Sequence, residues 1–302
     1  MIKLEDRQQL TDQELSEKAE LSGDTFFNEV CSAIKKNKMA LAGGIIIILL
    51  ILTAIFAPFL SPHDPYEVNL DIQFARPSAE HWLGTDEFGR DLLTRIMFGT
   101  RISLVIGLIP TFLSMVIGIV LGMVSGYYGK RTDFIIMRIA DVVLAFPELL
   151  LAMVVMYTLG ASLLNLFIAL SFVRWAGVAR VVRAQTMSIK EKEFIEASRA
   201  IGIKNWIIMF KHILPNCLSS LVVLFTLNIP GAILSEASLS FLGVGAQPPA
   251  ASWGLMISRG KEYLFSAPWV AISPGIAILI IVLAFNYLGD GLRDALDPYM
   301  KQ

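Results

Sequence analysis

Ionisable residues lie within long apolar stretches of this sequence, where a charge is costly unless it faces a cavity or a partner. Arg138 and Asp141 are three residues apart, a spacing that lets them pair on one helix. Glu148 and Arg174 each lie thirteen residues from Ala161, the centre of a short turn. They should therefore reach a similar depth, about 20 Å from the turn at 1.5 Å per residue. We expect these two side chains to pair across the two spans or to share the translocation cavity; the alternative is that they face different neighbours.

Other groups that could carry chemistry are few. Glu236 lies near the end of an apolar run, and we expect it to form hydrogen bonds at the membrane interface rather than to contact a substrate. His63 and His81 both lie in the segment expected to be extracytoplasmic and His212 in a cytoplasmic one, so the three together predict no histidine-rich metal centre, and no cofactor is expected. The sequence also lacks a nucleophile elbow, an H-E-x-x-H motif and a phosphate loop. Enzyme chemistry is therefore not expected.

Composition indicates a membrane protein. The hydrophobic fraction is 55% and the mean hydropathy is +0.63, whereas soluble domains are roughly 45–50% apolar. Each apolar run is long enough to cross a hydrocarbon core of about 30 Å. The sequence predicts an all-α polytopic protein with six transmembrane helices, at about residues 39–60, 102–127, 134–159, 163–182, 216–239 and 269–288.

Lys and Arg residues predict the orientation, because they gather in cytoplasmic loops. The first 38 residues hold six of them, whereas the turn around Ala161 holds none. Both termini should then be cytoplasmic. The net charge of -1 gives no sign of a nucleic-acid partner. The expected units are a cytoplasmic arm (1–38), a first transmembrane helix (39–60), an extracytoplasmic segment (61–98), a five-helix core (99–290) with a cytoplasmic loop at 188–214, and a cytoplasmic tail (291–302).

Two local patterns predict further structure. Asp86 and Arg90 stand in the favourable order for a helical ion pair, and an apolar face follows, so we expect an interfacial amphipathic helix there. Small residues recur every fourth position from Ser114 to Gly126, which lets another helix approach closely.

The polar stretch at 193–216 separates two apolar runs and reads EFIEASRAIGIKNWIIMFKHILPN. Its spacing predicts a short amphipathic helix that stops at Gly202, then a second apolar-faced segment at 203–213. Pro215 should push Leu214 away from helical geometry and begin the next helix. The apolar face of the first helix is expected to contain Phe194, Ala197, Ser198 and Ile201.

This stretch resembles the "EAA loop" of ABC-importer permeases, whose pattern is E-A-A-x3-G-x9-I-x-L-P. The run H-x-L-P-N resembles the peptide-importer branch of that family, and GTDEFGRD, SFLGVGAQPP, SWG and GDGLRDALDP are also similar to it. Ser198 replaces the second Ala of the pattern and His212 replaces its Ile, while exact matches are found at Glu196, Ala197, Gly202, Leu214 and Pro215.

The resemblance implies a type I ABC-importer permease fold in the cytoplasmic membrane of a prokaryote. It implies that the loop is a coupling helix that docks on an ATPase, and that this chain imports oligopeptides or dipeptides without hydrolysing ATP itself. The implied partners are a homologous second permease, two ATP-binding subunits and an extracytoplasmic peptide-binding protein. Two alternatives stay open. One is a nickel-type importer, and the other is an ion-coupled transporter that uses Asp141, Glu148 and Glu236 as ion sites.

Overall fold

The computed structural model describes residue 34 and residues 37–296. Most of the predicted arm, and the end of the predicted tail, lie outside the described residues. Apart from one isolated β-bridge, regular structure in the described part of the chain is helical. The elements are α2 (Lys38–Leu60), η1 (Leu70–Ile72), α3 (Leu92–Tyr128), α4 (Lys130–Ala145), α5 (Glu148–Leu159), α6 (Leu163–Lys190), α7 (Glu193–Ala200), α8 (Asn205–Ile207), η2 (Ile208–Ile213, a π-helix), α9 (Leu214–Phe241), α10 (Trp253–Gly260), η3 (Lys261–Tyr263) and α11 (Trp269–Leu296).

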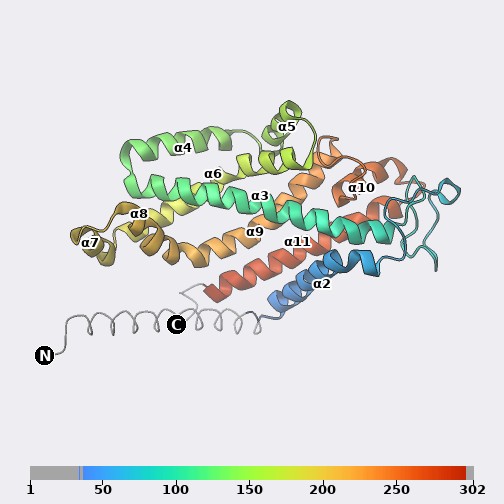
Figure 1. Ribbon diagram of the computed structural model, residues 1–302, viewed down its shortest axis with the longest axis horizontal. Coiled ribbons are helices and arrows are strands. Elements are labelled where there is room, and N and C mark those ends of the chain that lie inside the picture. Colours follow the sequence, from blue (N-terminus) through green and yellow to red (C-terminus); the bar gives the residue numbers. More distant parts are fainter. Residues whose placement is uncertain (1–33, 35–36, 297–302) are drawn as a thin grey trace.

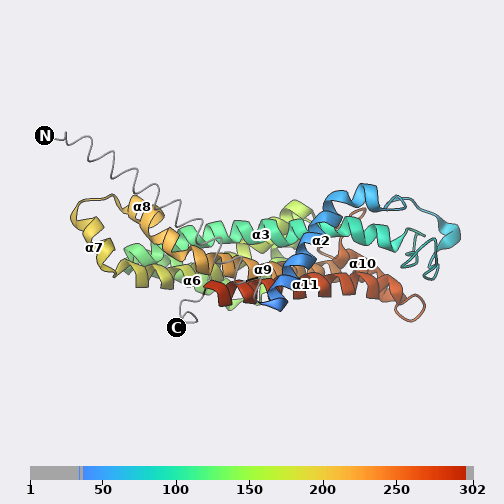
Figure 2. The same ribbon diagram turned by 90° about the horizontal axis from the view of Figure 1, so that it is seen from below.

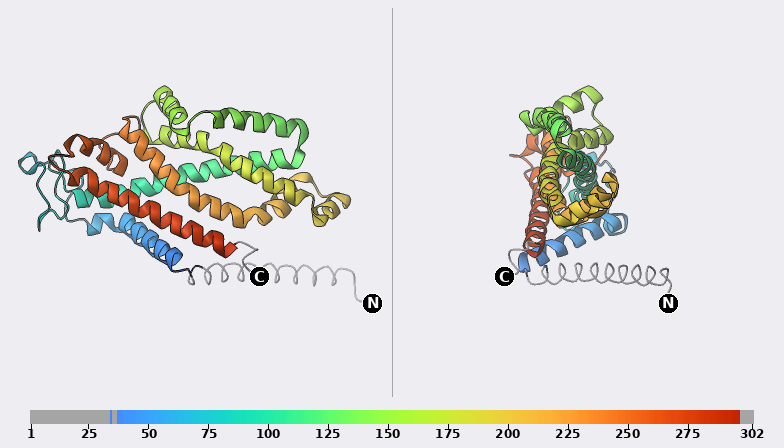
Figure 3. Two further views of the ribbon diagram at one scale, coloured as in Figure 1. Left: turned by 180° about the vertical axis from the view of Figure 1, so that it is seen from behind. Right: turned by 90° about the vertical axis from the view of Figure 1, so that its left-hand side faces the viewer.

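The long helices lie along the longest axis of an elongated bundle (Figure 1). Five of them are long and apolar enough to cross a membrane, and α4 with α5 makes a sixth if the bent pair counts as one span. Helices α2 and α11 lie together along one edge, and α4 and α5 lie along the opposite edge (Figures 1 and 3). Elements α7 and α8 lie at one end of the bundle, whereas residues 61–91 and α10 lie at the other (Figure 2). The predicted all-α, multi-span fold is confirmed.

The centre of the bundle is the contact between α3 and α6. A Cβ atom added to Gly118 would lie 2.6 Å from the Cβ of Val178, and one added to Gly122 would lie 2.6 Å from the carbonyl oxygen of Ala179. No larger side chain fits at these positions without movement. The small-residue ridge expected from sequence therefore lies against a neighbouring helix, where van der Waals contact between backbones replaces the hydrophobic effect that is absent in lipid.

Two elements differ from expectation. The ion pair of Asp86 and Arg90 exists, with 2.7 Å between Oδ2 and Nε, but both residues lie in a loop. Asp91 accepts a hydrogen bond from the Thr94 N–H at 2.8 Å and starts one continuous α3, so no separate interfacial helix precedes this span. The third span is broken, because α4 and α5 meet at an angle of 93°. Pro147, which follows the extended residue Phe146, explains the break.

Candidate functional site

The stretch at 193–216 folds into a compact turn that we call the elbow (α7, α8 and η2). Helix α7 ends where the sequence predicts, because Gly202 adopts a left-handed φ of +80°. The N–H of Gly202 donates to the Arg199 carbonyl at 3.0 Å, and the N–H of Ile203 donates to the Ser198 carbonyl at 3.1 Å. These two bonds form a Schellman motif, which satisfies carbonyls at the end of the helix. A defined stop after two turns holds α7 as a short rigid element.

The inner face of the elbow is fixed to the end of α3. The Tyr127 hydroxyl donates to Oδ1 of Asn205 at 2.9 Å, and the Arg199 guanidinium lies 5.1 Å from the centre of the Tyr127 ring. Ile195 and Ile208 are fully buried in a cluster that also contains residues of α3, α6 and α9. The elbow is therefore attached to the bundle by apolar packing and by directed contacts.

Its outer face carries exposed apolar side chains. Ile201 is 77% exposed and Trp206 is 60% exposed, and Phe194 and Phe210 are also exposed. On α7 the buried positions are Ile195 and Ser198. Of the residues expected on the apolar face, only Ser198 is buried, whereas Phe194 and Ile201 are exposed. Side chains of this size at the water-facing end of a membrane bundle are typical of an interaction surface.

The connection from the elbow to α9 has no interruption. Leu214 has φ -54° and ψ -46°, so the expected departure from helical geometry is also wrong. The π-helix η2 ends at Ile213, and Pro215 lies in the first turn of α9. A π turn shifts the hydrogen-bond register by one residue, which helps to absorb the missing N–H of proline within a continuous helix. Elbow and α9 thus form one connected body.

Glu148 and Arg174 contact each other in the interior of the bundle. Nε of Arg174 donates to Oε1 of Glu148 at 2.8 Å. The two terminal nitrogens of Arg174 donate to the Asn228 carbonyl at 2.9 Å and to Oγ of Ser235 at 3.3 Å. The Ser235 hydroxyl donates to the same Glu148 oxygen at 2.8 Å. One guanidinium therefore joins α5, α6 and α9. A Cβ atom added to Gly231 would lie 2.7 Å from a guanidinium nitrogen, so that glycine provides the space for Arg174.

A polar cavity of about 330 Å³ opens beside this ion pair. It lies at the bend between α4 and α5 and is also lined by α6 and α9. The Glu148 side chain is 40% exposed and the Arg174 side chain 12%. The pairing that was one of the alternatives predicted from sequence is therefore present, and both side chains also line this cavity. Such a cavity can hold a polar molecule that carries charges of both signs.

The remaining intramembrane charges are arranged differently from expectation. Asp141 pairs with Arg180 of α6 at 2.9 Å rather than with Arg138. Arg138 instead lies over the ring of Phe134, with 5.1 Å to the ring centre. Asp141 therefore pairs with a residue of the neighbouring helix α6 and not with Arg138, three positions away on its own helix.

Glu236 is 1% exposed and accepts a hydrogen bond from Oγ of Ser240 at 2.7 Å. It lies against Gly254 of α10, where an added Cβ would be 3.0 Å from its second oxygen. It is not among the residues that line the cavity beside Arg174. Its position between α9 and α10 fits the expected hydrogen-bonding role.

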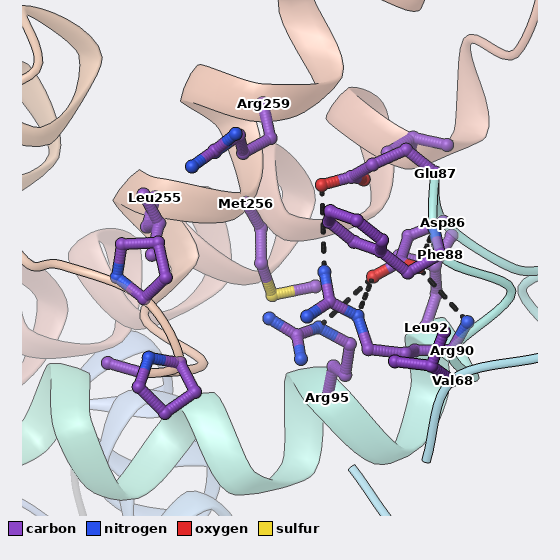
Figure 4. Close-up of a pocket in the computed structure, with 14 residues that line it drawn as sticks. Val68, Asp86, Glu87, Phe88, Arg90, Leu92, Arg95, Leu255, Met256 and Arg259 are labelled. Atoms are coloured by element: carbon purple, nitrogen blue, oxygen red, sulfur yellow. Dashed lines mark hydrogen bonds and ion pairs between the residues drawn. The ribbon is translucent and has the colours of Figure 1, made fainter. Parts of the chain in front are cut away.

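A second cavity, of about 210 Å³, lies near the far end of the bundle from the elbow (Figure 4). Arg90 lies between Asp86 and Glu87, at 2.7 and 3.6 Å, and Nε of Arg95 is 3.4 Å from Asp86. Residues of α10, among them Met256, form the opposite wall (Figure 4). This charged cluster connects the loop before α3 to α10.

Sequence reasoning missed the residues that hold the sites in place. Tyr127, Asn205, Ser235 and the Asn228 carbonyl lie far from their partners in the chain, so no local pattern identifies them. Proline was the one available signal, because Phe146-Pro147 marks the bend that places Glu148 at the cavity.

Known proteins resemble this chain over most of its length. Residues 118–302 match the family of the "Binding-protein-dependent transport system inner membrane component", and residues 25–77 match the "N-terminal TM domain of oligopeptide transport permease C". The dipeptide transport system permease protein DppC of Alkalihalophilus pseudofirmus is 48% identical and covers 91% of this chain and 90% of its own length. The glutathione transport system permease protein GsiD of Pectobacterium atrosepticum is 45% identical and covers 88% of this chain and 89% of its own length. The oligopeptide transport system permease protein OppC of Bacillus subtilis is 42% identical and covers 95% of this chain and 94% of its own length.

The fold also has a solved counterpart. A chain of the inward-facing MetNI methionine ABC transporter superposes with a TM-score of 0.56 at 20% identity and covers 68% of this chain and 98% of that one. Together with the spans, these matches identify a multi-pass protein of the cytoplasmic membrane. The chain belongs to the family of inner membrane components of binding-protein-dependent transport systems, and its relatives DppC and OppC are permease proteins.

Proposed function

We propose that the elbow receives the work of ATP-hydrolysing partner subunits and passes it to the transmembrane helices. The observation that carries this proposal is the division of the elbow into an anchored face and an exposed apolar face. Exposed Ile201 and Trp206 can be covered by a partner, whereas Tyr127 fixes the other face to α3. Glu196 and Ala197 lie on the exposed side of α7, and Gly202 ends it. His212, Leu214 and Pro215 then connect the elbow to α9.

The substrate class that we propose is small peptides. Relatives are named for the transport of dipeptides, oligopeptides and glutathione, all of which are peptides. A free peptide has an ammonium group and a carboxylate. The cavity beside Arg174 is lined by one negatively charged and one positively charged side chain, Glu148 and Arg174. In this proposal a second, homologous permease completes the pathway, an extracytoplasmic binding protein delivers the peptide, and both termini lie in the cytoplasm. Alternating access moves the peptide inward.

An ion-coupled transporter is less well supported. Such a protein needs a buried carboxylate that can load and release a cation. Glu148 and Asp141 are each paired with an arginine, and Glu236 lies outside the cavity. A proton gradient should therefore not drive uptake by this chain without its ATP-binding partners.

Cross-linking tests the docking surface. In a background with Cys31 and Cys217 replaced by Ser, Ile201→Cys should form a cross-link to an ATP-binding subunit in assembled transporter. Phe265→Cys is the matched control, because this side chain is fully exposed in the loop before α11, at the other end of the bundle (Figure 2). Equal capture of the ATP-binding subunit at both positions, or none at Ile201, would count against the proposal.

A helix-breaking change tests force transmission. Ala197→Pro adds a ring inside α7, where proline costs about 3 kcal/mol relative to alanine. We expect ATP hydrolysis to continue while peptide uptake stops. Ala197→Ser is the control, because it keeps the helix and a small side chain. Normal uptake by the proline variant would show that α7 does not act as a lever.

Uptake assays test the substrate class. Cells that lack only this chain should lose uptake of a labelled dipeptide and regain it when the chain is restored. If the same cells instead lose nickel uptake and keep peptide uptake, the nickel-type alternative is correct.

A further inference from the structure

Two of the three histidines, His63 and His81 of the segment predicted to be extracytoplasmic, lie side by side. The rings of His63 and His81 are 4.7 Å apart between centres and tilted by 34°. Asp91 lies next to them, with Oδ1 3.0 Å from Nδ1 of His81. One potential ligand atom from each of these three residues lies within 4.8 Å of the other two. The sequence-based prediction concerned all three histidines together; the meeting of His63 and His81 beside a carboxylate was not predicted.

The hydrogen bonds of the two rings determine which nitrogen is free. Nδ1 of His81 faces the Asp91 carboxylate, and Nε2 of His63 lies 3.2 Å from the Glu80 carbonyl. Carboxylate and carbonyl oxygens accept hydrogen bonds, so these two nitrogens carry the protons. In the neutral rings, Nε2 of His81 and Nδ1 of His63 keep their lone pairs. A histidine whose other N–H donates to a carboxylate or a carbonyl is the arrangement that orients metal ligands in proteins.

The surroundings favour a cation. A cavity of about 170 Å³ lies at these rings. Among the described residues none of those that line it is Lys or Arg, and its wall includes the carboxylates of Asp64, Glu67, Glu80 and Asp91. His81 and Asp91 are buried and His63 is half-buried. Arg95 donates to the Pro65 carbonyl at 2.8 Å but is not among the residues that line this cavity. A divalent cation would relieve the repulsion between the carboxylates of the wall.

We infer that His63 and His81, with Asp91 behind them and the carboxylates of the cavity, form a binding site for a divalent transition-metal ion, best matched by Zn²⁺. Imidazole and carboxylate together suit Zn²⁺, whereas Ca²⁺ and Mg²⁺ take oxygen ligands alone. Ligand atoms about 2.0–2.2 Å from Zn²⁺ can be at most about 4.4 Å apart. One potential ligand atom from each of the three residues lies within 4.8 Å of the other two, close to this limit, and binding of the ion would require the half-buried His63 side chain to adjust.

The site would connect two parts of the membrane bundle. His63 lies three residues beyond the end of α2, and Asp91 caps α3. A bound ion would therefore fasten the end of the first span to the start of the second, at the end of the molecule opposite the elbow (Figure 2). This inference stands independently of the proposed transport function.

Metal titration of the assembled, detergent-purified transporter tests the site. After chelation and dialysis, the wild type should bind one equivalent of Zn²⁺ at this site. In His63→Ala the affinity for this equivalent should fall at least about tenfold. His212→Ala is the matched control, because this histidine lies in the elbow, and it should bind as the wild type does. A complex with both His63→Ala and His81→Ala gives the background from the other subunits. No equivalent above that background in the wild type, or wild-type affinity in His63→Ala, would overturn the inference.

A second measurement separates ligation from folding. Co²⁺ bound in place of Zn²⁺ should give visible absorption bands of low-symmetry nitrogen and oxygen coordination, and these bands should be absent from His63→Ala. The metal-free wild type and metal-free His63→Ala should unfold at the same temperature, because His63 contributes one hydrogen bond on a half-buried loop. Zn²⁺ should then raise the unfolding temperature of the wild type alone. An equal rise in His63→Ala would show that Zn²⁺ acts elsewhere.

Discussion

Replacement of Arg174 by methionine removes the guanidinium that joins α5, α6 and α9 while keeping a long side chain. Glu148 then keeps one protein hydrogen bond, from Ser235 at 2.8 Å. Breaking a fully buried ion pair by removing one partner costs about 3–5 kcal/mol. Because the Glu148 side chain is 40% exposed, water replaces part of the lost interaction, and we expect a loss of about 2–4 kcal/mol in the free energy of unfolding.

Glu148→Gln should cost less. The amide oxygen still accepts hydrogen bonds from Arg174 and Ser235, so only the charge is lost, at about 1–2 kcal/mol. In the double variant, Arg174→Met no longer leaves an unpaired carboxylate, and the two costs should not add. We expect a coupling energy of about 1–2 kcal/mol between the two positions.

The assay is denaturant unfolding of the purified transporter in detergent, compared across the four members of this double-mutant cycle. The signal can be the fluorescence of Trp175, which is buried on α6 next to Arg174. Peptide uptake measured on the same variants tests the role of the pair in transport. Additive costs, with a coupling energy below about 0.5 kcal/mol, would refute the reasoning, because that is the error expected for independent sites.

Two further predictions follow from close contacts. Gly231→Ala should displace the Arg174 guanidinium, which lies 2.7 Å from the added Cβ, and should destabilise the protein by about 1–3 kcal/mol. Gly275→Ala, where an added Cβ meets open space, should not destabilise it; similar unfolding curves for the two variants would contradict this assignment. Tyr127→Phe should lose the hydrogen bond to Asn205, worth about 1 kcal/mol. It should lower peptide uptake per ATP hydrolysed, and an unchanged ratio would show that this bond does not take part in coupling.

The membrane spans were predictable because they follow from local physical chemistry. An apolar run of sufficient length must cross the bilayer as a helix, since lipid offers no partner to free N–H groups. The small-residue ridge around Gly118 and Gly122 was predictable for a similar reason, because only small side chains permit close approach of helices. The stop of α7 at Gly202 was predictable from the left-handed conformation that glycine readily adopts.

Pairings between helices were only partly predictable. Glu148 and Arg174 are equally far along the chain from the turn around Ala161. Because two helices joined by a short turn run alongside each other, this spacing predicted that the two residues could meet, and they do. The same sequence gave no sign that Asp141 reaches Arg180, since rotation of a helix about its axis decides which neighbour a side chain meets. His63 and His81 come together through a loop of irregular backbone, and periodicity carries no information about such a path.

The elbow and the polar cavity are connected by two continuous helices. Helix α6 runs from Arg174 at the cavity to Lys190 beside the elbow, a distance of about 24 Å at 1.5 Å per residue. Lys190 donates to the Gly126 carbonyl at 3.1 Å, near the attachment of the elbow to α3. Helix α9 leaves the elbow without interruption, lines the same cavity with Asn228 and places Ser235 against the Arg174 guanidinium. Any change in the angle between α6 and α9 at the elbow must therefore alter the distance between Arg174 and Ser235, whose hydrogen bond is already long at 3.3 Å. We expect this contact to break first when a partner moves the elbow, which would leave the guanidinium bound to Glu148 and to the Asn228 carbonyl and one of its terminal nitrogens without a partner from α9.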